Sequence, residues 1–483
     1  MRDGQVLWLK RLPLAWLGTI GAVCVGAWFY WSATLDHTRL TLGALPPGVA
    51  GSRLNVLLIT LDTTRADHLG AYGFQSISTP NIDRLAREGV LFEQNTTAAP
   101  LTLPAHASLF TGRFPPGHGV RDNVGFVLDP HETTMAKIFA GHGYRTGAFV
   151  GSFVLASSRG LNQGFDTYRD DFPPAETAHA LPGGLRRRAS EVTDQALEWI
   201  AGVGSSRFLA WLHFYDAHRP YDLPEPYASA YPSRPYDGEI EYMDAQVGRI
   251  LDFLQQQRLL DSTVVIVIGD HGESLGDHGE AGHGIFVYES VTRVPFIIRA
   301  PFERLHGRIV DDVTRSVDVL PTLLELVGIR SPVPLEGTSL VPVMTGKVGS
   351  LNLEAYSESL YPLRAFGWSE LHALRAGRFK VIAAPRPELY DLESDPFEEH
   401  NQYNERREVG EQMIARLHEL QRRSEASAPA ARPRVDGEAE TAARLATLGY
   451  LSRPRGAYTG GAIGATPPDP KDQIGLLEPG VQP

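Results

Sequence analysis

Three runs of consecutive apolar residues dominate the pattern of hydrophobic and polar positions along the chain. They cover residues 54–61, 208–214 and 263–269, and segments with helical periodicity, such as 82–88 and 241–256, alternate with them. Apolar runs of this length are typical of strands that are buried on both faces. Their alternation with helices predicts an α/β fold, in which helices sandwich a mostly parallel central sheet.

The pattern changes near residue 334. Short β-like segments at 373–376 and 379–383 are followed by a helical pattern at 406–423. This order predicts a smaller C-terminal α+β subdomain over residues 334–451, next to a catalytic α/β domain over residues 53–333.

The amino terminus contains a long stretch without charge. No residue from 12 to 35 is charged, and Arg2, Lys10 and Arg11 precede this stretch. About 20 apolar residues cross a bilayer as a helix, and basic residues stay on the cytoplasmic side. We therefore expect a cytoplasmic basic segment over residues 1–11, then a transmembrane anchor, and a catalytic domain in the periplasm or at the cell exterior. A cleaved signal peptide is the alternative interpretation, and it leads to the same location.

Two further segments have few residues that could build a core. Residues 36–52 contain several Gly and Pro residues and are expected to link the anchor to the catalytic domain. Residues 452–483 are also rich in Gly and Pro, so we expect a disordered tail.

The composition excludes several classes of function. The 483 residues carry a formal net charge of -12, which disfavours a nucleic-acid binder that acts by charge neutralisation. We therefore expect no nucleic-acid partner. The single cysteine, Cys24, excludes an intrachain disulfide framework and a metal site built from cysteines.

Acidic and histidine side chains follow the ends of the predicted strands. Asp62 comes directly after the first apolar run, and Asp270 and His271 come directly after the last. In parallel sheets, ligands bind at the carboxyl ends of the strands. Carboxylate and imidazole groups together suit a divalent ion such as Zn or Mn, and suit an all-oxygen Ca site less well. The sequence thus predicts a divalent metal site (Mn, Zn or Ca) held by these three side chains, and a second site stays open.

Thr102 lies at or just before the start of a helix-compatible segment. His106 follows four residues later, on the same face of such a helix. The N-terminus of a helix favours an anion, and a metal-bound hydroxyl loses its proton more readily. Thr102 is therefore a candidate metal ligand and nucleophile, with a simple helix cap as the alternative. His106 is a candidate for orienting Thr102 or for protonating the leaving oxygen, and the alternative is a histidine that bonds a nearby carbonyl.

Several motifs in order resemble the sulfatase family of the alkaline phosphatase superfamily. The resemblance runs from about Asn55 to Leu451. It rests on the segments 61–68, 79–86, 107–112, 270–272 and 388–396. It implies the family's α/β fold, a metal-dependent hydrolase, and a sulfate- or phosphate-ester substrate that belongs to a glycan or a lipid.

The departures from the family pattern affect the chemistry. The family's cysteine or serine, which becomes formylglycine, is matched by Thr102, so no formylglycine is expected. Thr63 stands at the second Asp of the family's opening pair, His106 at its arginine, and His283 at its later lysine. The family's substrate-binding histidine is kept as His218, which the resemblance implies as a substrate contact or as the proton donor to the leaving oxygen.

The predicted substrate contacts are Thr63, Arg65 and His283. Thr63 and Arg65 are expected to line the anion site. For Arg65 there is an alternative, because it could equally pair with Asp67 or with another acidic residue.

A threonine nucleophile affects which ester the enzyme can cleave. A sulfated formylglycine hydrate collapses to the aldehyde, whereas a threonine sulfate has to be attacked by water. A phosphorylated threonine can be attacked at phosphorus, and residues 270–284 also resemble the metal region of membrane phosphoethanolamine transferases, which have a Thr nucleophile. We therefore favour a phosphoester over a sulfate ester. A phosphotransferase on the same scaffold and an inactive binding homologue are the alternatives.

Overall fold

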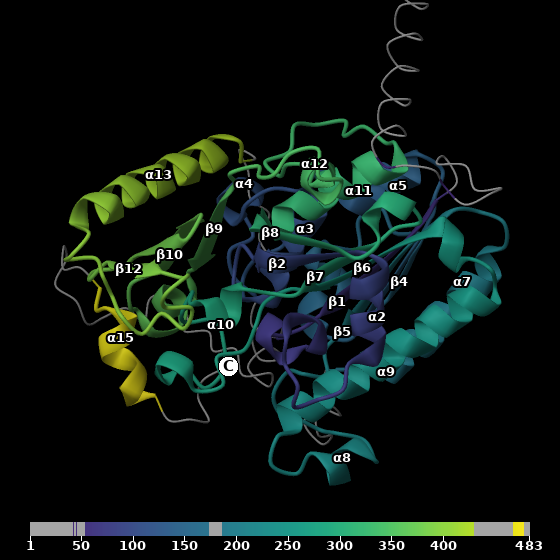
Figure 1. Ribbon diagram of the computed structural model, residues 1–483, viewed down its shortest axis with the longest axis horizontal. Helices are drawn as coiled ribbons and strands as arrows, with labels where there is room; N and C mark the ends of the chain where they lie inside the picture. The colour runs from purple at the N-terminus through teal and green to yellow at the C-terminus, as the bar shows by residue number, and fades with distance from the viewer. Residues whose placement is uncertain (1–41, 43–44, 46–53, 173–185, 429–466, 478–483) are drawn as a thin grey trace, which may run out of the picture.

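The computed structural model describes residues 42, 45, 54–172, 186–428 and 467–477. A large part of the molecule carries an eight-stranded sheet, and a smaller part carries a four-stranded sheet (Figure 1). The predicted segments 1–11 and 12–35 and most of the linker 36–52 lie outside the described residues.

The large sheet has the strand order β4-β3-β5-β1-β6-β7-β2-β8, and within it only β7 runs antiparallel to its neighbours. Its strands are β1 Asn55–Leu61, β2 Val90–Thr96, β3 Arg145–Val150, β4 Thr167–Arg169, β5 Phe208–Phe214, β6 Thr263–Gly269, β7 Phe296–Arg299 and β8 Arg308–Arg315. The mostly parallel central sheet is confirmed. The three apolar runs form the adjacent strands β5, β1 and β6 in the middle of the sheet.

Successive side chains of β1 enter two separate hydrophobic cores. Val56 and Leu58 belong to one core, and Leu57 and Ile59 to the other, as the two-residue period of a strand requires. The first core is covered by α3 Thr102–Thr111, α5 Met135–Gly141, α11 Val319–Val327 and α12 Val341–Met344. The second core is covered by α2 Pro80–Glu88, α7 Ala189–Val203 and α9 Pro235–Gln256 (Figure 1).

The smaller sheet is antiparallel, in the order β12-β11-β10-β9. Its strands are β9 Glu354–Ser359, β10 Leu371–Ala376, β11 Phe379–Ala383 and β12 Glu388–Asp391. One long helix, α13 Arg407–Ala426, packs on this sheet through Met413 and Leu417. The elements agree with the α+β subdomain expected here, while the domain boundaries stay predictions.

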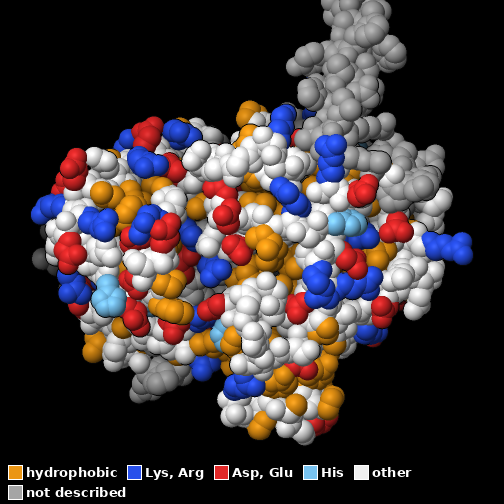
Figure 2. All heavy atoms as spheres, in the orientation of Figure 1, with side chains coloured by type: hydrophobic (Ala, Val, Ile, Leu, Met, Phe, Trp, Pro, Cys, Tyr) orange, Lys and Arg blue, Asp and Glu red, His pale blue; other side chains and the backbone are white. Residues whose placement is uncertain are grey.

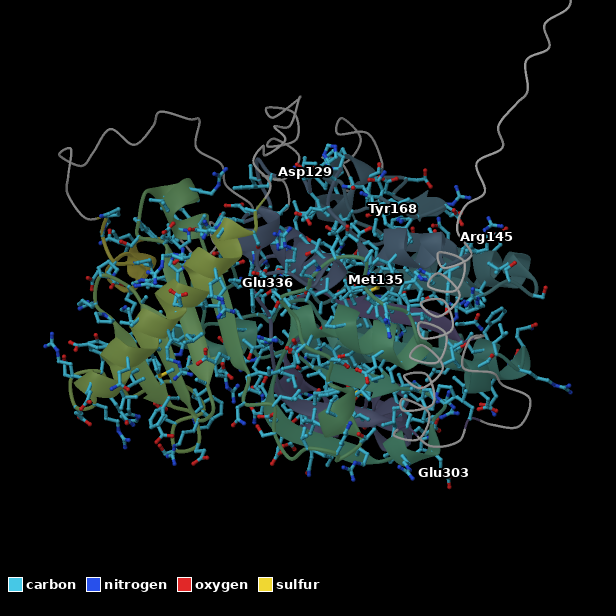
Figure 3. The ribbon with its side chains drawn as sticks, turned by 90° about the horizontal axis from the view of Figure 1, so that it is seen from above. Asp129, Met135, Arg145, Tyr168, Glu303 and Glu336 are labelled. Carbon is cyan, nitrogen blue, oxygen red and sulfur yellow. The ribbon has the colours of Figure 1, made fainter. Side chains whose placement is uncertain are left out.

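Polar contacts fix the smaller sheet to the large part of the molecule. Glu336, near the junction in Figure 3, accepts hydrogen bonds from Phe114 N at 2.7 Å and from Ser424 Oγ of α13 at 3.1 Å. The carboxylate of Glu358 in β9 accepts a hydrogen bond from the guanidinium of Arg121. The backbone N–H of Glu358 donates to Ala98 O at 3.0 Å. Because Ala98 comes just before α3, the smaller sheet supports the segment that leads into that helix.

Residues 467–477 correct the prediction of a tail disordered throughout 452–483. This segment forms the short helix α15 Pro470–Gln473, in which the side chain of Asp469 accepts from Lys471 N at 3.0 Å. Ile474 is buried beside Gly279, and Lys471 Nζ lies 2.7 Å from Glu388 Oε1. Composition could not reveal this, because the segment is ordered by tertiary contacts with distant residues.

The described residues include no helix that is long and apolar enough to cross a bilayer. Acidic and basic side chains are interspersed over the face shown in Figure 2. On this face, therefore, the net negative charge of the chain is not gathered in one patch.

Lys471 gives a test of the docked tail segment. Glu388 is buried and also accepts a hydrogen bond from Tyr288 at 2.8 Å. The substitution Lys471→Met leaves this carboxylate without its cation, so we expect the free energy of unfolding to fall by about 1–3 kcal/mol. Urea unfolding measures the change. The control is Lys347→Met at an exposed lysine, and equal unfolding midpoints for the two variants would contradict the docking.

Candidate active site

Three side chains meet at the carboxyl ends of β1 and β6. The two strands pair in parallel with Leu61 opposite Gly269, so Asp62, Asp270 and His271 follow at the same edge of the sheet. His271 Nε2 lies 3.6 Å from Asp270 Oδ2 and 3.9 Å from Asp62 Oδ1, and all three side chains are buried. One ligand atom from each lies within 4.8 Å of the others. The structure thus brings together the three predicted metal ligands.

Thr102 is the first residue of α3, and its hydroxyl faces this group. Its Oγ1 lies 3.4 Å from Asp62 Oδ2 and 3.3 Å from His271 Nε2. The preceding residue, Leu101, is extended, and Asn123 Oδ1 accepts from Leu103 N at 2.8 Å. These features start the helix at the point where the threonine hydroxyl reaches the carboxylates.

The N-terminus of α3 offers an anion fewer N–H groups than the sequence suggests. Leu103 N already donates to Asn123, and Pro104 has no N–H. Among the first three residues of the helix, at most the N–H of Thr102 is left for an anion. Most of the neutralisation of a bound anion therefore has to come from another source.

The two carboxylates are arranged as cation ligands. Burial raises the pKa of Asp62 well above its usual value, and the charge of Glu273 adds to the effect. Burial and the nearby Asp62 raise the pKa of Asp270 in the same way. Asp62 Oδ1 and Asp270 Oδ2 have no hydrogen-bond partner among the residues that the structure describes. Two adjacent buried carboxylates keep their charge only beside a cation, so this donor set fits a divalent metal ion.

His271 has the proton arrangement of a metal ligand. Its Nδ1 lies 3.0 Å from Gly272 O, a carbonyl that can only accept, so the proton sits on Nδ1. Burial, reinforced by the neighbouring His283, lowers the pKa of His271 well below its usual value, so the ring is neutral. The lone pair of Nε2 therefore points toward the two aspartates and Thr102, as in histidines that bind a metal.

Both ring nitrogens of His106 are occupied by the protein. Nδ1 donates to Thr102 O at 2.8 Å, and Nε2 lies 3.0 Å from Thr60 Oγ1. The neutral imidazole has its one proton on Nδ1, so Nε2 accepts from the Thr60 hydroxyl, which itself accepts from Trp211 Nε1 at 3.0 Å. The structure corrects the prediction that His106 protonates the leaving oxygen. His106 bonds a nearby carbonyl, as in the alternative, and that carbonyl belongs to Thr102, so a role in orienting Thr102 stays a prediction.

His218 and His283 lie beside His271. The ring centroid of His283 is 4.4 Å from that of His271 and 5.0 Å from that of His218. Burial lowers the pKa of His283 to about 3, so its imidazole is neutral. Its Nδ1 lies 3.4 Å from Glu273 Oε1. The structure therefore places both predicted histidines next to the metal-ligand group.

Thr63 supports the site through its backbone. Its φ of 48° lies in the left-handed region, which a β-branched residue adopts only under strain. In this conformation Thr63 N donates to Asp270 Oδ1 at 3.2 Å, and Thr63 O accepts from Tyr236 at 2.7 Å. The Thr63 hydroxyl is buried without a hydrogen-bond partner in the described part of the chain, which leaves it available to a substrate.

Arg65 pairs with acidic residues, which was the alternative to its predicted place in the anion site. Its guanidinium lies 2.8 Å from both Asp67 and Asp277, and these two ion pairs occupy its charge. It also contacts the carbonyl of Glu273 at 3.3 Å. Arg65 thus fixes the loop after β6 and is not a free cation for an anionic substrate.

Two further polar residues, in the loops after β5 and β6, are engaged in structural contacts. Asp216 accepts from Ala189 N at 3.0 Å and so caps the start of α7. His278 stacks on Tyr288 with a centroid distance of 3.6 Å. These contacts give both residues structural roles.

Sequence reasoning gave no role to His213 and Glu273. His213 lies at the end of β5, with Nε2 3.1 Å from Asp62 Oδ2. An ionisable residue inside an otherwise apolar buried strand was the available signal. Glu273 lies only two residues after His271, and its buried carboxylate meets His283. The pairing with a histidine ten residues further along depends on the path of the loop.

Comparisons with known proteins show which family the chain belongs to. A family model described as Sulfatase matches residues 54–329, and one described as N-sulphoglucosamine sulphohydrolase, C-terminal, matches residues 276–423. The steryl-sulfatase of Mus musculus is 28% identical over a match that covers 76% of this chain and 81% of that protein.

Two further relatives come from bacteria. The multifunctional alkaline phosphatase superfamily protein PehA of Trinickia caryophylli is 26% identical, over 72% of this chain and 91% of that protein. The crystal structure of the phosphonate monoester hydrolase of Agrobacterium radiobacter superposes with a TM-score of 0.65 at 23% identity. The superposition covers 77% of this chain and 96% of that one, and it shows a shared fold.

The first family model spans more than half of the chain and includes Asp62, Thr102, Asp270 and His271. The chain belongs to the sulfatase family of the alkaline phosphatase superfamily, and it is an ester hydrolase.

Proposed function

We propose that this protein is a metal-dependent hydrolase that cleaves phosphoric or sulfuric esters through Thr102, with phosphoesters favoured. One observation carries the proposal. The Thr102 hydroxyl lies within 3.4 Å of Asp62 Oδ2 and His271 Nε2, at the first residue of α3. A threonine that only capped a helix would have no reason to face two buried metal ligands.

The proposed metal site consists of Asp62, Asp270, His271 and Thr102. A divalent cation bound there lowers the pKa of a hydroxyl and stabilises negative charge on the ester oxygens. The unpartnered oxygens of the two aspartates and the neutral imidazole of His271 are suitable ligands for Mn, Zn or Ca.

Thr102 Oγ1 attacks phosphorus or sulfur in line with the leaving oxygen and forms a covalent threonine ester. The proton lost by the threonine has to end on the leaving oxygen. His218 is the candidate carrier, because Arg219 O at 2.5 Å accepts from its Nδ1, which fixes the ring proton on Nδ1 and makes Nε2 the basic nitrogen. Water then attacks the covalent ester and frees Thr102.

The neutral histidines bear on the charge of the substrate. His106 and His283 stand where the family has an arginine and a lysine, and burial lowers the pKa of both imidazoles. With fewer cationic side chains near Thr102, the site suits an ester with a single negative charge. Phosphodiesters, phosphonate monoesters and sulfate esters have this charge, and only the phosphorus esters also permit water to attack readily at the central atom.

The relatives are consistent with either ester. The name of the mouse relative is steryl-sulfatase, and that of the Agrobacterium structure is phosphonate monoester hydrolase. A glycan or lipid is our candidate for the group that carries the ester. Transfer to an acceptor hydroxyl instead of water is the second candidate function, favoured by the resemblance of residues 270–284 to phosphoethanolamine transferases.

The Thr102→Ala variant tests the nucleophile. Because the variant lacks the attacking oxygen, we expect kcat/KM to fall by at least about 10³-fold on the preferred substrate, while Thr102→Ser keeps part of the activity. Aryl phosphodiester, phosphonate, phosphate and sulfate esters are assayed in parallel, with and without an alcohol acceptor. Thr111→Ala, at the other end of α3, is the control and should stay within about threefold of wild type. A Thr102→Ala variant with the kcat/KM of wild type would refute the mechanism. If the sulfate ester is cleaved fastest of the four substrates, the preference for phosphoesters is refuted.

Removal of metal tests whether activity requires a divalent cation. A chelator should abolish activity, and Mn²⁺ or Zn²⁺ should restore it. Excess metal, at about 100 times its Kd, stabilises the fold by about 2.7 kcal/mol, so it should raise the Tm of the metal-free protein. Asp270→Asn should lose this rise, and the control Asp261→Asn, at an exposed carboxylate, should keep it. Full activity in protein shown to be metal-free would contradict the proposal.

We further propose that residues 12–35 anchor the protein, with the catalytic part outside the cytoplasm. The support is the uncharged stretch and the basic residues that precede it. Full-length protein should sediment with membranes, and protease added to spheroplasts should digest the catalytic part. Protection from the protease in intact spheroplasts would reverse the proposed orientation.

A further inference from the structure

His213 contacts Asp62, one of the proposed metal ligands. It is on β5, opposite Thr60 of the adjacent strand β1, and it is completely buried. Its ring centroid lies 5.1 Å from that of His106 in α3. The two imidazoles therefore fill the space between the sheet and the start of the helix that carries Thr102.

The contacts of His213 show which nitrogen carries the proton. Gly151 N–H donates to Nδ1 at 3.4 Å, so Nδ1 is an acceptor. A neutral imidazole has one N–H, and the proton therefore sits on Nε2. This Nε2 lies 3.1 Å from Asp62 Oδ2, which makes the contact a hydrogen bond from His213 to the aspartate.

A second cation site is the competing interpretation. His106, His213 and Asp270 each offer one ligand atom, and these atoms lie within 4.8 Å of one another. The nitrogen of His106 that faces this group is Nδ1, and it carries a proton that it donates to Thr102 O. A protonated ring nitrogen cannot bind a cation, and the same holds for Nε2 of His213. His213 therefore presents an N–H donor to Asp62, and His106 donates its own N–H to the Thr102 carbonyl.

We propose that His213 is a positioning residue for Asp62. Its Nε2–H holds Oδ2 and so fixes the rotation of the carboxylate, which leaves the unpartnered Oδ1 on the side of His271, where the two would hold a cation. This inference rests on the proposed metal-dependent function. Groups that orient a metal ligand in this way typically change metal affinity by about 10–100-fold.

Three substitutions at one position test the proposal. In His213→Gln the side-chain amide reaches the place of Nε2 and keeps an N–H for Asp62. In His213→Asn the amide reaches only the place of Nδ1, and His213→Leu has no donor at all. The probe is Mn²⁺, titrated into metal-free protein by calorimetry, with the Tm of the metal-free protein measured in parallel.

We expect the two amide variants, His213→Gln and His213→Asn, to differ in their affinity for Mn²⁺. His213→Gln should bind Mn²⁺ within about fivefold of wild type, whereas His213→Asn and His213→Leu should bind it about 10–100-fold more weakly. The proposal is overturned if all three variants bind Mn²⁺ like wild type. It is also overturned if Gln weakens binding as much as Leu, as expected for a histidine that itself binds the cation.

The outcomes separate this proposal from the proposed function. Wild-type protein that binds none of Mn²⁺, Zn²⁺ and Ca²⁺ overturns both. Wild-type protein that binds Mn²⁺ and loses activity in Thr102→Ala, together with equal affinities in the His213 series, overturns only the role of His213. If His213→Leu fails to fold, the comparison of Gln with Asn still decides the question.

Discussion

The site depends on two buried carboxylates held side by side. Asp62 and Asp270 end adjacent strands, and each raises the cost of charging the other in a place that water does not reach. A fold that keeps both groups in this position needs a cation between them, or else protons on them. The unpartnered oxygens show that the protein itself does not supply this compensation within the described residues. The metal chemistry follows from this electrostatic conflict.

The protein places hydrogen-bond donors around the remaining carboxylate oxygens. Asp270 Oδ1 accepts from His271 N at 2.7 Å and from Thr63 N, and the second of these bonds requires the left-handed conformation of Thr63. Strain of this kind costs on the order of 1–3 kcal/mol and persists where the surrounding contacts enforce it. The aspartates are thus oriented before a cation arrives, which reduces the cost of binding one.

Elements far from the site hold its loops in place. Arg65 ties Asp277 to the segment after β1, and Ile474 from the docked tail packs beside Gly279 in the same loop. The smaller sheet bonds to the segment that leads into α3. The described C-terminal residues therefore act on the site as a support.

The sequence by itself determined the central strands, the helices between them and the meeting of Asp62, Asp270 and His271 at the strand ends. These features follow from local patterns, because an apolar run specifies a buried strand and parallel strands end at one edge. The placement of Thr102 at a helix start was also local. Motif order was sufficient to indicate the family.

Only the tertiary structure decided how the polar side chains pair. Arg65 could have faced a substrate, but two acidic residues lie within reach of its guanidinium. The spacing of four residues places His106 on the same helix face as Thr102. Its hydrogen bonds, however, depend on Thr60, which Trp211 also contacts, and these two residues come from different strands. His213 and the docked segment 467–477 gain their roles from neighbours more than 80 residues away along the chain. Hydrogen bonds and burial depend on distance in space, and that distance exists only once the chain has folded.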